Sequence, residues 1–90
     1  MVVSYNRNMK KTITNTLLGR ICNLMGEQNL TQYRLAEKSG LPFSTVKSIM
    51  QRKTNNISLK TIILLAKGLE IHPSKLIEGD EFIADNLDLE

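Results

Sequence analysis

Residues 32–51 read QYRLAEKSGLPFSTVKSIMQ, and this stretch decides the fold of the chain. Its first half carries Leu35 and Ala36 on one side, and Gly40 follows as a residue that tolerates the left-handed turn just past a helix. Pro42 suits a helix start, because the N–H that proline lacks would be unpaired there. The stretch therefore predicts two short helices joined by a tight turn, over Gln32–Ser39 and about Phe43–Gln51.

The second of these helices has two different faces. Val46 and Ile49 point inward, with Met50 beside them. A short helix with one buried face and one face of hydrogen-bonding groups fits the major groove of DNA, which is about 12 Å wide. The opposite face spans about 140° at about 100° per residue, and we interpret its residues as candidates for reading bases: Phe43, Ser44, Lys47, Ser48 and Gln51. The Phe43 ring either packs on a thymine methyl group or folds back over Leu41 or Tyr33.

Helical periodicity continues on both sides of this stretch. Between Thr14 and about Gln28, five apolar residues share an arc of about 120°. Thr31 and Ser58 are good N-caps, because a hydroxyl accepts a free backbone N–H at a helix start. Ser58 predicts a helix over Leu59–Leu69, and Pro73 opens a short fifth helix that Gly79 closes. The expected inward residues are Leu17, Leu18, Ile21, Leu24 and Met25 in the first helix, and Leu59, Ile62, Ile63, Ala66 and Leu69 in the fourth.

The two parts of the chain differ in charge. All 12 Lys and Arg residues lie between Arg7 and Lys75, and up to residue 77 only three Glu residues oppose them. The last 13 residues carry six acidic side chains and no basic one. A basic body with an acidic end suggests a polyanionic partner for the body.

The composition argues against catalysis, metal binding and membrane insertion. His72 and Cys22 are the only residues of their types, so they provide neither a metal-ligand cluster nor a disulfide within this sequence, and a reducing, cytoplasmic setting is expected. The longest apolar run, Ile62–Ala66, is too short to cross a membrane. We find no nucleophile–base pattern and no glycine-rich phosphate loop. The sequence predicts no enzyme, no metal site and no cofactor.

The sequence resembles the Cro and phage-repressor helix-turn-helix family, also called the xenobiotic-response-element type. The resemblance covers about Ile13 to Ile77. It implies an all-α, compact five-helix, lambda-repressor-like domain that is usually dimeric and controls nearby promoters. The matching residues are Leu30-Thr31-Gln32, Leu35-Ala36, Gly40-Leu41, Ser44-Thr45-Val46, Ile49, Asn56, Ser58-Leu59, Thr61-Ile62, Leu65-Ala66 and Leu69-Glu70-Ile71.

The resemblance also implies roles for individual residues. Ser44, Lys47 and Ser48 match positions that commonly touch base edges, and Gln32 matches one that usually holds a phosphate. Phosphate contacts need cations and amide or hydroxyl donors. The candidates for phosphate contact are Thr31 and Gln32 at the start of the second helix, and Arg52, Lys53, Thr54, Asn55 and Asn56 in the loop after the third.

We therefore expect a flexible basic arm over residues 1–11, a helix-turn-helix DNA-binding domain over 12–79 and an acidic tail over 80–90. The tail could be a docked helix, a strand or a frayed end. The expected function is a sequence-specific regulator of transcription, a repressor that binds double-stranded DNA as a homodimer, with no membrane partner and no small-molecule effector. The apolar residues left for a dimer contact are Leu76, Ile77, Phe82 and Ile83. The alternative is a protein–protein interaction module on the same fold, for example one that binds a partner as an antitoxin does.

Overall fold

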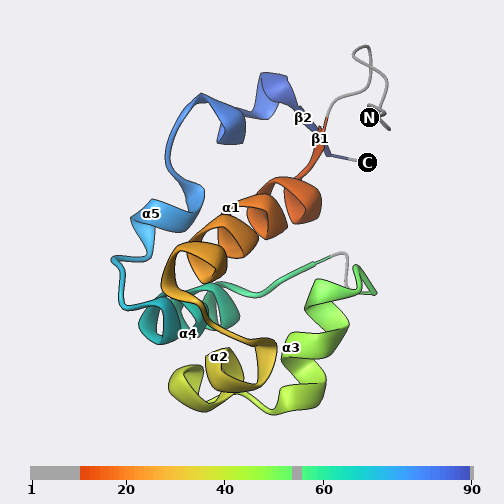
Figure 1. The fold of residues 1–90 in the computed structure, drawn as a ribbon. Helices are drawn as coiled ribbons and strands as arrows, with labels where there is room; N and C mark the ends of the chain where they lie inside the picture. Colours follow the sequence, from red (N-terminus) through yellow and green to blue (C-terminus); the bar gives the residue numbers. More distant parts are fainter. Residues whose placement is uncertain (1–10, 54–55, 90) are drawn as a thin grey trace, which may run out of the picture.

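Helices form most of the structure, a computed structural model that describes residues 11–53 and 56–89 (Figure 1). The predicted all-α class and the five helices are confirmed. The predicted basic arm covers residues 1–11, and residues 1–10 of it lie outside the described part of the chain. The helices are α1 (Ile13–Gln28), α2 (Gln32–Ser39), α3 (Phe43–Met50), α4 (Leu59–Leu69) and α5 (Ser74–Ile77).

Side-chain caps begin three of the helices. The hydroxyls of Thr31 and Ser58 each accept a backbone N–H at 3.1 Å, from Arg34 and Thr61 respectively, as predicted. Thr12 caps α1 in the same way through the N–H of Asn15, at 3.0 Å. These hydroxyls satisfy donors that have no partner inside a helix, so each helix begins where its cap stands.

Left-handed residues stand at the C-caps of three of the helices. Gly40 closes α2 with φ 76°, as predicted, whereas α1 and α4 end at Asn29 and Glu70, with φ of 54° and 59°. Residues other than glycine rarely adopt this backbone conformation, so no glycine marks the ends of α1 and α4, but the ends predicted from apolar periodicity, near Gln28 and at Leu69, are confirmed.

The core lies between α1, α2, α3 and α4, with α5 closing one side. Its fully buried side chains come from every one of these helices: Leu17 and Ile21 from α1, Leu35 from α2, Val46 from α3, Leu65 and Leu69 from α4, and Leu76 from α5.

The predicted inward face of α4 is wrong in two places. Leu59 and Ile63 expose 66% and 46% of their surface, while Leu65 is buried at 1%. The reason is a close crossing of α2 over α4 at Gly68, which turns the face of Leu65, Ala66 and Leu69 toward the core. Ile62 stays half-buried at the edge.

Gly68 permits this close crossing. A Cβ atom at residue 68 would overlap the Ser39 hydroxyl and lie 3.0 Å from Leu35 Cδ1 and 3.1 Å from the Leu35 carbonyl oxygen. Beside it, Lys38 of α2 forms an ion pair of 2.6 Å with Glu70 at the end of α4, and this hydrogen bond lowers the pKa of the Glu70 carboxyl. The pair of helices that carries the turn is thus fixed to α4.

The predicted acidic tail folds back over α1. It contains two short 3₁₀ turns, η1 (Asp80–Phe82) and η2 (Ala84–Asn86), and then β2 (Leu87–Asp88), which pairs in parallel with β1 (Lys11–Thr12). Of the three alternatives for the tail, a short strand is therefore correct for its end. In Figure 1 the tail, in blue, lies at the opposite end of the molecule from α2 and α3.

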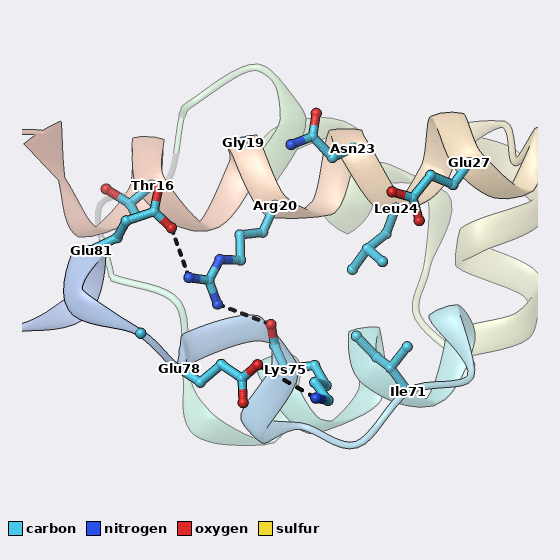
Figure 2. A pocket seen from close by; sticks show the side chains of 11 residues that line it. Thr16, Gly19, Arg20, Asn23, Leu24, Glu27, Ile71, Lys75, Glu78 and Glu81 are labelled. Atoms are coloured by element: carbon cyan, nitrogen blue, oxygen red, sulfur yellow. Dashed lines mark hydrogen bonds and ion pairs between the residues drawn. The ribbon is translucent and has the colours of Figure 1, made fainter.

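Arg20 of α1 fastens the tail to the helices. Its guanidinium donates to the Glu81 carboxylate at 2.7 Å and to the Lys75 carbonyl at 3.1 Å (Figure 2). The same guanidinium lies 5.2 Å from the centre of the Phe82 ring, a cation–π geometry. These contacts hold the Glu81 carboxylate and the start of the tail against α1.

Candidate nucleic-acid interface

The turn between α2 and α3 places α3 at the surface. The Gly40 and Leu41 N–H groups both donate to the Ala36 carbonyl, and Pro42 then begins α3 with φ −60°. Val46 and Ile49 are buried, so the opposite face of α3 points outward. The outer face of α3 is therefore accessible to a partner along most of the length of the helix.

The predicted base-reading residues occupy this outer face. Phe43, Ser44, Lys47 and Gln51 are exposed, and Ser48 is half-buried. Four of the five thus lie on α3, and Gln51 is the residue that directly follows it. Lys47 lies one turn after Phe43, near the middle of the face.

Phe43 also packs against its own chain. Its ring lies 5.8 Å from the Tyr33 ring, centroid to centroid, at an interplanar angle of 60°. This tilted arrangement is one that aromatic pairs favour. Phe43 still exposes 42% of its surface. The contact between the two rings links the exposed Tyr33 of α2 to the start of α3. Tyr33 entered the sequence analysis only as packing for Phe43, and it widens the exposed face.

The predicted phosphate-contacting residues flank α3 on both sides. Thr31 is exposed and Gln32 half-buried at the start of α2, while Arg52, Lys53 and Asn56 are exposed after α3. Thr54 and Asn55 lie outside the described residues. Thr31 already accepts the Arg34 N–H, so its hydroxyl has its proton left to donate.

Some cations are paired with acidic side chains and others are available. Arg20, Arg34, Lys38 and Lys75 bond acidic side chains, and two of these, Arg34 and Lys38, lie on α2. Within residues 11–53 and 56–89, no acidic side chain forms an ion pair with Lys47 or Lys53. The positive charge that faces solvent beside α3 is therefore not neutralised, which suits a polyanion.

A sequence model of the helix-turn-helix family matches residues 23–76. This is more than half of the chain, and it includes α2, the turn and α3. The chain belongs to the Cro/C1-type helix-turn-helix family. The resemblance seen in the sequence is confirmed.

Individual members of the family give a finer comparison. The control protein C.SmaI of Serratia marcescens is 45% identical over 49 residues, which are 54% of this chain and 57% of that protein. The chain thus matches a little over half the length of this curated relative.

Solved structures match over a larger share. The restriction-modification controller protein C.AhdI of Aeromonas hydrophila has a TM-score of 0.63 and 33% identity, over 70% of this chain and 94% of that one. The wild-type restriction-modification controller protein C.Esp1396I has a TM-score of 0.63 and 28% identity, over 71% of this chain and 82% of that one.

A groove lies on another side of this helix-turn-helix protein. It has a volume of about 580 Å³ and runs between α1, α5 and the start of the tail, with Leu24 and Ile71 among its lining residues (Figure 2). Its cations are already bound: Arg20 to Glu81, and Lys75 to Glu78 at 3.5 Å. The groove therefore offers no unpaired cation to a phosphate.

Two further properties concern the described residues alone. No group of three or more His, Cys, Asp and Glu residues among them is placed to hold a metal ion. No helix among them is both long and apolar enough to cross a membrane.

Phe43→Ala is expected to lower the melting temperature. An aromatic pair of this kind contributes ~1 kcal/mol beyond its buried area, and each kcal/mol shifts the melting temperature of so small a domain by roughly 4–8 °C. Thermal unfolding followed by circular dichroism measures this, with Tyr33→Ala as the matched control that removes the other ring. An unchanged melting temperature, together with an affinity loss confined to thymine-bearing DNA, would make Phe43 a base-reading residue instead.

Proposed function

We propose that the protein is a sequence-specific, double-stranded DNA-binding regulator of transcription that inserts α3 into the major groove. The observation that carries the proposal is the outer face of α3, where Ser44, Lys47 and Gln51 present hydrogen-bonding groups on a helix whose other face is buried. A Lys side chain donates to guanine O6 or N7, and hydroxyl and amide groups donate or accept at base edges. The proposed role is one of binding, with no enzymatic step. The proposed location is the cytoplasm, together with the DNA.

The distribution of charge supports this orientation. Arg52 and Lys53 lie directly after α3, where they would meet phosphates beside the groove that Lys47 enters. The acidic tail lies at the opposite end of the molecule (Figure 1). Docking through α3 therefore brings the phosphates to the cations and keeps them away from the carboxylates.

The names of the relatives narrow the proposal to a class of regulator. C.AhdI and C.Esp1396I are restriction-modification controller proteins, and C.SmaI is a control protein. We propose that this chain likewise controls the expression of a restriction-modification system or of a similarly small operon, acting as a repressor at its operator.

We further propose that it binds DNA as a homodimer, because one short helix reads too few base pairs to select a site in a genome. Two of the four residues expected at the dimer contact are used inside the monomer: Leu76 is fully buried, and Phe82 packs against the core. Exposed apolar side chains that stay available for a dimer contact include Ile77 and Ile83, together with Leu59 and Ile63, which lie one turn apart on α4.

Selection from a library of random duplexes tests the function. A dimeric reader should enrich a palindromic sequence whose half-sites are about one helical turn, ~10 bp, apart. Binding to unselected duplex DNA at low salt should be weak and should fall steeply as salt is added.

The same experiment distinguishes the alternative. An interaction module that binds only protein would enrich no sequence and would show no salt-dependent affinity for duplex DNA. That result would overturn the proposed function and favour the protein-binding alternative.

A further inference from the structure

The chain leaves α3 through a turn that normally favours glycine. Arg52 has φ +59°, its N–H donates to the Ile49 carbonyl at 3.0 Å, and the Lys53 N–H donates to the Ser48 carbonyl at 3.0 Å. This is the pattern of a helix end whose first residue past the cap is left-handed. A non-glycine residue in this conformation is uncommon and persists where its surroundings hold it.

A contact with a distant part of the sequence supplies that support. Arg52 Nε donates to Oδ1 of Asn15 at 2.6 Å. Asn15 lies in the first turn of α1, and the distance is short for a hydrogen bond between a charged donor and a neutral acceptor. The Asn15 side chain therefore fixes the direction of the Arg52 guanidinium.

Asn15 is itself held in place. Its backbone N–H donates to the Thr12 hydroxyl at 3.0 Å, and Thr12 belongs to β1, which pairs with Asp88 of β2. The Thr12 carbonyl in turn accepts the Thr16 hydroxyl at 2.8 Å. The acceptor for Arg52 thus stands on a capped helix end that is anchored to the tail.

This contact leaves the rest of the Arg52 side chain available. Only Nε is bonded to Asn15, and the guanidinium is a rigid plane with further N–H donors at its two terminal nitrogens. Lys53 follows directly and is exposed, and neither residue forms an ion pair within the described part of the chain. Two cations are therefore presented at the exit of α3, and the Arg52 guanidinium is held there by Asn15.

We propose that Asn15 is a positioning residue for DNA binding: by holding Arg52, it fixes the turn after α3 so that Arg52 and Lys53 meet the phosphates beside the groove that α3 enters. The inference rests on the proposed function and adds a residue that touches no DNA itself. Asn15 lies outside the segment that the family model matches.

The experiment measures the affinity for a selected operator duplex, or for random-sequence duplex DNA at low salt, over a series of salt concentrations. Asn15→Ala should weaken binding roughly tenfold, as the loss of a hydrogen bond to a charged group does. It should also reduce the slope of log affinity against log salt by up to about one unit, as the loss of one phosphate contact does. This effect is diagnostic, because Asn15→Ala removes no charge.

A double-mutant comparison tests the mechanism. In the parent protein, Lys53→Ala should lower the affinity for DNA and reduce the salt slope. In the Asn15→Ala variant the same change should have a much smaller effect, because Lys53 is already misplaced there. Asn23→Ala makes the same change on an exposed position of α1 away from this turn and should bind like the parent.

The result does not depend on Asn15→Ala folding well. Arg52→Gly removes the same contact from its other side while glycine favours the left-handed turn, so this variant should keep the parent's melting temperature and still bind DNA more weakly. Parent-like affinity of either variant, or fully independent losses from Asn15→Ala and Lys53→Ala, would overturn the inference alone. A parent protein that binds no duplex DNA would overturn the proposed function, and the inference with it.

Discussion

Gly68→Ala should lower the melting temperature of the protein by roughly 10 °C. The new methyl group would overlap the Ser39 hydroxyl and press on Leu35, and both residues are fully buried. Overfilling a packed core costs ~1–3 kcal/mol, and each kcal/mol corresponds to roughly 4–8 °C in a domain of this size. Thermal unfolding followed by circular dichroism measures the change.

Gly19→Ala is the matched control for this prediction. Gly19 lies inside α1, and a Cβ atom there would meet nothing within 4 Å. Alanine is favoured over glycine inside a helix by ~1 kcal/mol, so this variant should melt a few degrees higher.

Ser39→Ala identifies the group that Gly68 accommodates. The Ser39 hydroxyl is buried and has no hydrogen-bond partner among residues 11–53 and 56–89. Its removal should leave stability unchanged or raise it, because an unsatisfied buried hydroxyl costs free energy. In the Gly68→Ala background the same change should recover part of the lost stability. If Gly68→Ala melts at the parent's temperature, α2 and α4 do not cross as closely as described.

Lys47→Ala should reduce operator affinity by about 10- to 100-fold and relax the preference at one base pair. The estimate follows from ~1–3 kcal/mol for a good contact between a cationic side chain and guanine. Lys47 is exposed near the middle of the outer face of α3 and supports no buried residue. Thermal stability should therefore stay within a degree or two of the parent's.

Binding of the selected operator and of its single-base variants measures both effects. Lys67→Ala is the control, because it removes the same charge from an exposed position on α4. It should leave base preference unchanged. A Lys47→Ala protein with the parent's affinity and selectivity would mean that the outer face of α3 does not read bases.

Local signals in the sequence predicted the helices well. Thr31, Gly40 and Ser58 act through hydrogen bonds or backbone conformation within four residues, and both bounds of α2 and the start of α4 follow from them. Asn29, Arg52 and Glu70 turn the chain without glycine. Asparagine tolerates this conformation by itself, whereas Arg52 and Glu70 have side-chain contacts with Asn15 and Lys38, on other helices.

Features that depend on distant residues were not predictable from spacing. The apolar pattern of α4 did not decide whether Leu59 and Ile63 or Leu65 faced inward, because the choice depends on where α2 crosses at Gly68. The tie between Asn15 and Arg52, and the one between Arg20 and Glu81, join residues far apart in the sequence. No periodicity or motif marks such pairs.

The base-reading part of the candidate site could be predicted from the sequence because its residues lie on or next to one helix, α3. A period of 3.6 residues places Ser44, Lys47 and Gln51 opposite Val46 and Ile49, and the structure has them so. Their contacts with bases, and those of the flanking residues with phosphates, stay predictions that the variants above test.

The pairing of β1 with β2 has a consequence for the order of folding. It joins residues near opposite ends of the sequence, so it closes a loop that includes every helix. The helix pairs in closest contact, α2 with α4 and α2 with α3, lie much nearer to each other in the sequence than β1 and β2 do, and shorter-range contacts of this kind form more quickly. The pairing of two residues contributes little free energy compared with the chain entropy that is lost when so long a loop is closed. The helical core should therefore assemble first, and the pairing of β1 with β2 should form last and open most often.

Native-state hydrogen exchange measures this order. The backbone amides of Leu87 and Asp88 should exchange faster than those of Leu35 and Leu65, and equal rates would mean that the β1–β2 pairing and the core open as one unit.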